Sequence, residues 1–397
     1  MSDPWPAFVE RADGAETAGY FERSATHDAT GGVAVAFTRA EEVRTLDART
    51  DREELSRATE RYLGGGRGRA VLGYAGFEAF GLFEPALRRV PGGSPFPLGE
   101  FAFVSGTTVG RPRRSRPTPR PPPTPMRPLE DSMPRHRFEA SVRRLQREIR
   151  NGEAYQVVLA HRRSWARPSD LLERAAGLRA SERYAFFFYL RFGDREIVGV
   201  SPESVVEVDG RRAVVNPIAG TVPLGAGARG RLPLEVDPKE LAEHRMLVDL
   251  ARNDLGRIAR PRTVRLLSRE RRVRYARLDH LVSRVAADLK PGVGPWDALA
   301  ATFPAGTVSG APKIRATELL EREEGTWRGP YAGAVGLLRP GGRADWALAI
   351  RTGFAVGPRL YTAAGAGIVY RSEPRREFVE TLTKLAHVEE LLAGGIP

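Results

Sequence analysis

The sequence of 397 residues contains no cysteine. This absence excludes disulfides, thiolate metal sites, iron–sulfur clusters and a cysteine nucleophile. Any chemistry must therefore use oxygen and nitrogen groups. Lysine, asparagine and glutamine are also scarce, with four, three and two copies, so each remaining copy is a candidate for a specific role.

Long apolar runs are missing as well. The longest spans 184–190, well short of the roughly 18 residues that a membrane helix needs. The first residues also lack the basic start and apolar stretch of a signal peptide. The composition, with 41% hydrophobic and 28% charged residues, is that of a globular protein. We therefore expect a cytoplasmic protein with no membrane partner.

The formal net charge of +13 comes mainly from arginine, because the 62 basic residues include only four lysines. A basic excess can indicate nucleic-acid binding. Here the arginines are scattered along the chain and do not gather on one predicted helix face. We therefore predict a solvated arginine-rich surface and no nucleic-acid partner.

A change in composition divides the chain. Residues 111–134 contain nine prolines and six arginines, which favours extended, solvated backbone. This segment is predicted to be a linker or a long loop. It separates an N-terminal portion, 1–110, from a larger domain, 135–397. In the N-terminal portion the pattern predicts a strand and turn at 70–78 and little else.

After the linker, helical and strand patterns alternate. Apolar spacing and capping residues predict the helices, and short apolar runs with one Asp-Gly turn predict the strands. The predicted helices cover 137–150, 237–251, 311–324 and 377–392. The predicted strands cover 154–160, 184–190, 197–200, 205–208, 213–215, 332–338 and 346–351. This order predicts an α+β fold with antiparallel sheet.

Three glutamates on two predicted helices are candidate metal ligands. Glu240 and Glu243 lie three residues apart on one helix, and Glu380 lies on the last helix, one turn before Lys384. Carboxylates from two helices suit Mg²⁺, which leaves its other positions to water and an anionic substrate. Acidic pairs at this spacing are common, so the spacing by itself favours solvated helix residues.

Four glycine-bearing segments are predicted to be loops, at 217–221, 304–313, 331–334 and 364–367. Glycine lets backbone N–H groups approach a carboxylate or phosphate closely, and the second segment leads into a helix N-terminus. Together they indicate an anionic small molecule, although any one of them could be an ordinary turn. The sequence has neither a Walker A nor a GxGxxG pattern, which argues against ATP and NAD.

These motifs, in this order, resemble the chorismate-utilising enzymes, which include anthranilate, aminodeoxychorismate, isochorismate and salicylate synthases. The resemblance covers about residues 137–392. It implies a sandwich of antiparallel β-sheets flanked by helices, with 1–110 as the N-terminal portion of that fold and 135–397 as its chorismate-binding catalytic domain. The segments that carry it are GEAYQVVL (152–159), SPE (201–203), PIAGT (217–221), DPKELAEHRMLVDLARNDLGR (237–257), HLVS (280–283), FPAGTVSGAPK (303–313), AIRT (349–352), AGAGIV (364–369) and ET (380–381).

The resemblance also implies roles for individual residues. Glu243 and Glu380 bind Mg²⁺ with Glu240 beside them, and the ion binds the ring carboxylate of chorismate next to Lys384. Glu203 is the general acid for the departing C4 hydroxyl, a role that requires a raised pKa. The residues that line the ring pocket are Thr221, His280 and Thr307.

The enolpyruvyl carboxylate of chorismate has its own implied site. Arg351 and Tyr331 hold it, and Arg suits this role because its guanidinium pairs both carboxylate oxygens. Backbone N–H groups of the glycine-bearing segment assist them. The residues of that segment are Gly365, Ala366 and Gly367.

Two positions distinguish the members of the family. Isochorismate and salicylate synthases carry a lysine where this chain has Gln156, and aminodeoxychorismate synthases often carry one where it has Ala219, next to Gly220. Both positions match the anthranilate synthase pattern, in which ammonia adds at C2 and the C4 hydroxyl leaves. The expected product is anthranilate after pyruvate elimination, or 2-amino-2-deoxyisochorismate, which would indicate specialised metabolism. The alternatives are 4-amination to aminodeoxychorismate, isochorismate or salicylate synthesis, and a non-catalytic chorismate-binding protein.

The missing cysteine also bears on the source of ammonia. Family members obtain it from a glutamine amidotransferase whose nucleophile is a cysteine thiolate. A chain without cysteine cannot supply that nucleophile. We therefore predict a separate glutamine amidotransferase subunit as partner.

Overall fold

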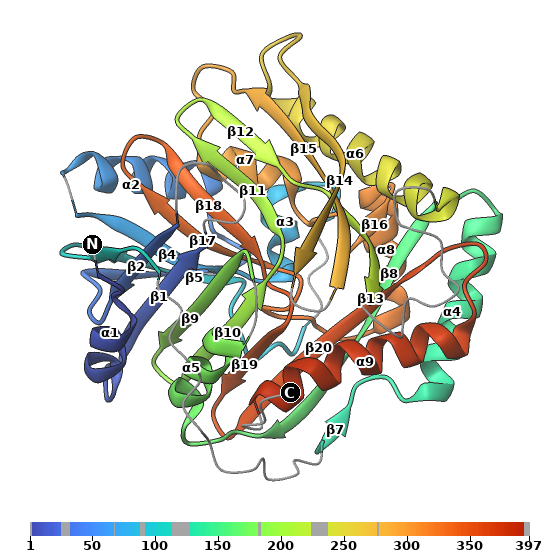
Figure 1. Cartoon of the computed structure of the whole chain (residues 1–397), viewed down its shortest axis with the longest axis horizontal. Helices are drawn as coiled ribbons and strands as arrows, with labels where there is room; N and C mark the ends of the chain where they lie inside the picture. Colours follow the sequence, from blue (N-terminus) through green and yellow to red (C-terminus); the bar gives the residue numbers. More distant parts are fainter. Residues whose placement is uncertain are drawn as a thin grey trace.

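Two antiparallel sheets with helices outside them form the computed structural model of the chain (Figure 1). The structure describes residues 2–24, 32–66, 68–87, 92–112, 128–181, 184–223, 237–275 and 278–392. Within these residues each sheet has ten strands. The α+β fold predicted from the sequence is therefore confirmed.

The first sheet, sheet A, contains strands from both sides of the predicted linker. Across it lie, in order, β16 (Gly310–Ala311), β8 (Gln156–Ala166), β20 (Arg359–Ile368), β19 (Thr352–Val356), β10 (Arg195–Ser201), β9 (Phe186–Phe192), β1 (Thr17–Arg23), β2 (Val33–Phe37) and β6 (Thr108–Gly110), with β7 (Glu130–Asp131) also paired to β8. The N-terminal portion thus supplies β1, β2 and β6.

The second sheet, sheet B, is built in the same way. Across it lie, in order, β13 (Ile218–Pro223), β15 (Leu278–Asp288), β12 (Arg212–Val215), β11 (Ser204–Asp209), β18 (Arg343–Leu348), β17 (Ala334–Arg339), β4 (Ala70–Ala75), β5 (Gly99–Val104) and β3 (Glu42–Leu46), with β14 (Arg265–Tyr275) also paired to β15. The predicted hairpin at Asp209-Gly210 is confirmed, because β11 and β12 pair with Asp209 opposite Arg212.

Helices pack on both sheets. They are α1 (Trp5–Ala12), α2 (Arg52–Gly64), α3 (Phe80–Phe83), α4 (Arg135–Arg150), α5 (Leu171–Ser181), α6 (Pro238–Ile258), α7 (Pro295–Thr302), α8 (Lys313–Glu324) and α9 (Pro374–Leu392), with a short 3₁₀ turn, η2 (Phe77–Ala79), before α3. Helices α4, α5, α8 and α9 contact sheet A, whereas α6 and α7 contact sheet B. Among the described helices none is long and apolar enough to cross a membrane.

Strand β9 is buried on both of its faces. Phe186 and Phe188 belong to the core that also contains Trp346 of sheet B. The alternate residues, Phe187 and Tyr189, belong to a second cluster on the helical side of sheet A. Because successive side chains of a strand point to opposite faces, one continuous apolar run fills both layers.

Two of the four predicted loops are wrong. The segment 217–221 enters β13, which pairs with β15, and 364–367 lies inside β20, which pairs with β8. The glycines of β20 serve close packing instead of a turn, since a Cβ on Gly367 would lie 2.6 Å from Gln156 Nε2. The strand predicted at 346–351 is also too long, because β18 ends at Leu348.

The two sides of the predicted linker are joined in the sheets. Strand β1 pairs with β9, and β4 pairs with β17. Residues 113–127 of the linker lie outside the described part of the chain, and Glu130–Asp131 near its end form β7. The division into 1–110, 111–134 and 135–397 stays a prediction.

Candidate active site

The site is built where the chain passes twice between the two sheets. It leaves β10 of sheet A for β11 of sheet B at residues 202–203, and it returns from β18 to β19 at residues 349–351. These crossings lie side by side because β10 pairs with β19 and β11 pairs with β18. Two backbone bonds join them: Leu348 N donates to Glu203 O over 3.0 Å, and Val200 N donates to Arg351 O over 3.3 Å.

Glu203 is buried at the first crossing. Its side chain is 8% exposed, and Thr307 Oγ1 donates a hydrogen bond to Glu203 Oε1 over 2.7 Å. Burial raises the pKa of Glu203 to about 8, although the bond from Thr307 lowers it. At neutral pH this carboxyl therefore carries a proton that it can donate, which is the requirement for the predicted general acid.

Arg351 turns the chain at the second crossing. Its φ of 51° lies in the left-handed region, which is sparsely populated by residues other than glycine. Ala332, with φ of 64°, faces the same crossing, where Ala332 N donates to Ala349 O and Ala349 N donates to Gly333 O, each over 2.9 Å. The predicted partners Tyr331 and Arg351 are thus brought to adjoining turns. Such backbone conformations gather at functional sites.

A line of contacts runs from Tyr331 to helix α9. Tyr331 is buried, and burial raises its pKa to about 12 although a bond with the Gly365 backbone lowers it. Lys384 Nζ donates to Gly365 O over 2.9 Å and forms an ion pair with Glu380 Oε1 at 2.8 Å. The predicted binding residues of β20 and α9 therefore lie together. Glu380 and Lys384 are about half exposed.

Gln156, at the start of β8, lies against the same part of β20. Its side chain fills the space that a Cβ on Gly367 would need. Gly310 lies on its other side, where φ is 134° and a Cβ would lie 2.2 Å from Gln156 O. Ala366 of β20 pairs with Leu159 of β8. Gln156, the position predicted to distinguish water from ammonia chemistry, is therefore in contact with the predicted substrate segment.

Comparison with known proteins assigns the family. The family described as chorismate binding enzyme matches residues 6–390, which is almost the whole chain. This chain belongs to the chorismate-binding enzyme family. The match also includes the N-terminal portion, where the sequence motifs are sparse.

Individual relatives agree with this assignment. Anthranilate synthase component 1 of Methanothermobacter thermautotrophicus is 44% identical over 254 residues, covering 63% of this chain and 55% of the relative. The 2-amino-4-deoxychorismate synthase of Streptomyces globisporus is 42% identical over 272 residues, covering 67% and 54%. The matched part of the chain thus spans little more than half the length of these relatives.

A solved structure extends the likeness to the fold. Anthranilate synthase component I of Streptococcus pneumoniae superposes with a TM-score of 0.76 at 30% identity, covering 93% of this chain and 89% of the other. The pair of antiparallel sheets described above is therefore the fold of this family.

The remaining predicted site residues lie mainly on sheet B. Ala219, Gly220 and Thr221 are in β13, and the side chains of this segment are outside the described part of the structure. His280 is buried in β15. Glu240 and Glu243 are on α6, which packs on β13 and β15. Their roles stay predictions.

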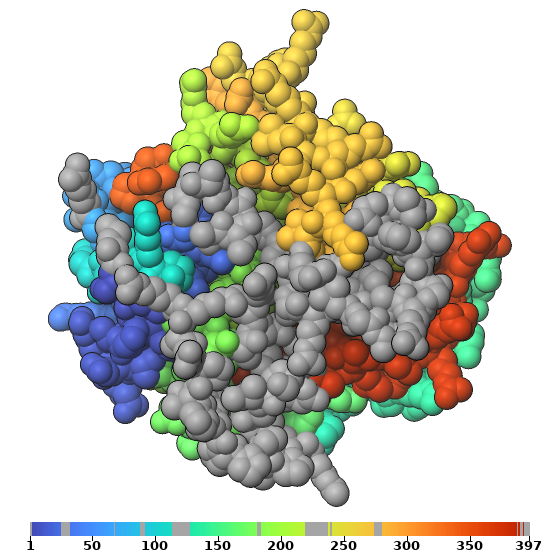
Figure 2. All heavy atoms as spheres, in the orientation of Figure 1, coloured from blue at the N-terminus to red at the C-terminus, as the bar shows by residue number. Residues whose placement is uncertain are grey.

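The donor chemistry of the predicted metal site fits Mg²⁺. Glu240 and Glu243 lie on α6 over sheet B, and Glu380 lies on α9 over sheet A. Within the described residues no group of three or more His, Asp or Glu side chains is placed to hold a metal. Mg²⁺ does not need one, since it commonly uses one or two carboxylates with water and an anionic substrate. Figure 2 shows 238–275, in yellow, and α9, in red, on the same face of the molecule.

The structure adds Arg328, a residue that the sequence motifs did not indicate. This guanidinium is 4% exposed and forms an ion pair with Glu324 at 2.6 Å. It donates to Val308 O and to Val158 O, each over 2.7 Å. It thereby ties the loop that carries Thr307 to strand β8. Arg328 lies four residues beyond the last residue of α8, after the helix cap at Gly325, so no helical spacing in the sequence indicates this pair.

Asp254, near the end of α6, takes part in a buried contact between three helices. Lys313 Nζ forms an ion pair with Asp254 Oδ2 at 2.8 Å and donates to Thr302 O over 2.9 Å. This contact joins α6, α7 and α8. Because both charges are buried, the pKa of Lys313 is lowered and that of Asp254 is raised. One of the four lysines therefore has a structural role.

Proposed function

We propose that this chain catalyses the Mg²⁺-dependent amination of chorismate at C2, with loss of the C4 hydroxyl as water. The product is anthranilate if pyruvate is then eliminated, and 2-amino-2-deoxyisochorismate if it is not. The observation that carries the proposal is the buried carboxyl of Glu203, because a pKa near 8 keeps it protonated at neutral pH.

The surrounding side chains suit the parts of this substrate. Glu203 would donate its proton to the C4 oxygen as it leaves, with Thr307 holding the carboxyl in place. Arg351 would pair the enolpyruvyl carboxylate beside the buried Tyr331. Lys384, held at Gly365, would add positive charge near the ring carboxylate.

The predicted metal would act at the ring carboxylate. Glu243 and Glu380 would hold Mg²⁺, with Glu240 beside them, and the ion would supply positive charge to the substrate carboxylate. In this proposal the protein's own contribution would be to supply carboxylates from helices on two different sheets to one substrate.

The relatives favour C2 as the site of amination. The name of the Streptomyces globisporus enzyme, 2-amino-4-deoxychorismate synthase, describes an amino group at C2 and no hydroxyl at C4. Anthranilate carries its amino group at the equivalent position, and the Methanothermobacter relative is named anthranilate synthase component 1. Gln156 supports the same choice, because the resemblance associates a lysine there with attack by water.

The direct test is identification of the product. Purified protein is incubated with chorismate, Mg²⁺ and ammonium at alkaline pH, and the products are separated and weighed by mass spectrometry. Anthranilate or 2-amino-2-deoxyisochorismate is expected. A product aminated at C4 would show that the chain is an aminodeoxychorismate synthase. Absence of any product would favour a non-catalytic chorismate-binding protein.

The choice of nucleophile depends on Gln156. We expect wild-type protein with ammonium to give aminated product, and Gln156→Lys to add a measurable fraction of isochorismate, because an amine can act as the base that activates water. The aminated product and isochorismate are quantified from the same reaction by chromatography. Isochorismate or salicylate as the main product of the wild type would contradict this assignment.

Glutamine should not replace ammonium for the 397-residue chain. We expect turnover with high ammonium, loss of at least 100-fold with glutamine alone, and recovery when a compatible amidotransferase is added. The reason is that no cysteine is present to attack the carboxamide. Glutamate release is measured beside product formation, and equal rates from the isolated chain would show that the partner is not needed.

A further inference from the structure

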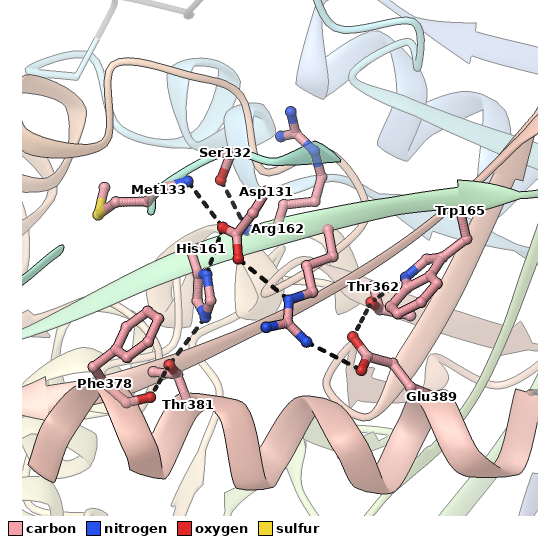
Figure 3. A network of polar contacts seen from close by, with 11 residues as sticks. Asp131, Ser132, Met133, His161, Arg162, Trp165, Thr362, Phe378, Thr381 and Glu389 are labelled. Atoms are coloured by element: carbon pink, nitrogen blue, oxygen red, sulfur yellow. Dashed lines mark hydrogen bonds and ion pairs between the residues drawn. The ribbon is translucent and has the colours of Figure 1, made fainter. Parts of the chain in front are cut away.

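Helix α9 is anchored to strand β8 by a buried histidine. His161 of β8 is 2% exposed, and its ring packs against Phe138 of α4 and Phe378 of α9, with ring centroids 5.8 Å and 5.6 Å away. Its Nε2 lies 3.0 Å from Thr381 Oγ1 on α9. Figure 3 shows this ring reaching from the strand to the helix.

Both ring nitrogens of His161 have a polar partner. Nδ1 lies 2.9 Å from Asp131 Oδ1, and a carboxylate oxygen accepts a hydrogen bond. Thr381 Oγ1, which lies 3.0 Å from Nε2, also bonds Phe378 O over 2.7 Å. A hydroxyl both donates and accepts, so it pairs with Nε2 in either tautomer of the ring. The ring direction is therefore determined at both ends.

Asp131 is itself held from two further directions. Met133 N donates to Asp131 Oδ1 over 3.0 Å, and Arg163 Nε donates to Asp131 Oδ2 over 3.2 Å. Arg163 lies two residues beyond His161 on the same face of β8 and also forms an ion pair with Glu389 of α9 at 3.4 Å. The strand therefore contacts the helix through two separate polar links.

Thr381 lies next to the predicted site residues of α9. It follows Glu380 directly in the sequence, and Lys384 is one turn later. The next buried residues along α9, Leu385 and Val388, are apolar. Apolar contacts are not directional and permit a helix to slide or rotate, whereas a hydrogen bond requires one geometry. The bond to His161 is therefore a buried directional contact next to Glu380, and it restricts where Glu380 points.

A similar bond follows the other predicted ligand. His244 comes directly after Glu243 on α6, and its Nε2 lies 2.7 Å from Ser283 Oγ on β15. Both His244 and Ser283 are fully buried. Each of the two carboxylates is thus followed by a residue in a buried bond between an imidazole and a hydroxyl, on a helix that packs against a different sheet.

We propose that His161, held by Asp131, is a positioning residue that sets Glu380 and Lys384 through its hydrogen bond to Thr381. The proposal rests on the function proposed above for Glu380. Removal of a hydrogen bond that orients a metal ligand without touching the metal typically lowers metal affinity or activity by about 10- to 100-fold. Thr381 has no contact with substrate in this scheme.

The test compares two threonines at the same interface between α9 and sheet A. Thr381→Val removes the hydroxyl that His161 needs. Thr362→Val is the matched control: Thr362 of β20 donates to Glu389 Oε1 over 3.1 Å and accepts from Trp165 Nε1 over 3.0 Å. Both changes keep the shape and leave one buried ring nitrogen without its partner, so both should lower stability by a similar amount. Thr381→Ser restores the hydroxyl.

Two measurements are made on each full-length variant. The first is the Mg²⁺ concentration for half-maximal amination with ammonium, and we expect Thr381→Val to raise it about tenfold and Thr362→Val to change it less than twofold. The second is hydrogen exchange of backbone amides in 374–385 without Mg²⁺ or substrate. We expect faster exchange there in Thr381→Val and wild-type exchange in Thr381→Ser.

The outcomes separate the proposal from the proposed function. Equal Mg²⁺ response in the two valine variants, or unchanged exchange in Thr381→Val, would overturn the positioning role. Wild-type protein without any Mg²⁺ response would contradict the metal site, and the exchange data would then decide the anchor by themselves. His161→Leu should reproduce Thr381→Val in both measurements, and wild-type behaviour of that variant would equally overturn the proposal.

Discussion

Replacement of Glu203 by glutamine is expected to lower kcat by about 10²- to 10⁴-fold, the usual contribution of a general acid. The amide keeps the shape of the side chain and can still accept the bond from Thr307 Oγ1, but it cannot protonate the leaving hydroxyl. Chorismate binding should therefore change little. The measurement is kcat from initial rates, with binding followed separately by calorimetry, and a kcat within a few-fold of wild type would remove Glu203 from its role.

The pH dependence gives an independent check on the same carboxyl. The proposed general acid must be protonated to act, and its pKa is about 8, so we expect wild-type kcat to fall as the pH rises above 8. Thr307→Val should move this fall to higher pH, because the lost hydrogen bond favours the carboxylate. In Glu203→Gln the residual rate should show no such fall.

Stability provides the control for Glu203. Between the ordinary glutamate pKa of 4.5 and about 8, the unfolded chain releases a proton that the folded chain keeps. The folded state then binds more protons, so this group makes the free energy of unfolding fall as the pH rises through that range. Glu203→Gln should abolish this contribution and be relatively more stable at pH 8 than at pH 5. A stability loss that is equal at both pH values would indicate general damage to the fold.

Removal of Mg²⁺ is expected to have an effect of comparable size. Excess EDTA, Glu243→Gln and Glu380→Gln should each reduce turnover by at least 100-fold, because each removes the ion or one negative charge from its ligands. Turnover is measured with chorismate and ammonium, and Mg²⁺ added back after EDTA should restore the wild type.

A control substitution near α9 tests whether any lost negative charge in this region, or only the loss of a predicted ligand, lowers the Mg²⁺ response. Glu373 precedes the first turn of α9 and forms an exposed ion pair with Arg376 at 3.0 Å. Glu373→Gln removes a charge from the same region and should leave the Mg²⁺ response unchanged, since exposed pairs contribute little. Full activity of the wild type in excess EDTA would show that the metal assignment is wrong.

The family and the α+β class follow from the sequence, because their evidence is local. The spacing of Phe138, Val142 and Leu145 predicts the helix at 137–150. The dipeptide Asp209-Gly210, which favours a tight turn, predicts the hairpin. Motif order then indicated the chorismate-binding enzymes. Each of these features depends on residues that are neighbours along the chain.

The tertiary structure decided what depends on distant partners. The glycines of 364–367 look like a turn until β8 pairs beside them, and β1 is recognised by its pairing with β9, about 170 residues later. The pKa of Glu203 is raised by its burial and lowered by the hydrogen bond from Thr307, which is 104 positions away. A pKa is set by desolvation and nearby charge, and these arise only when the two sheets close around the side chain.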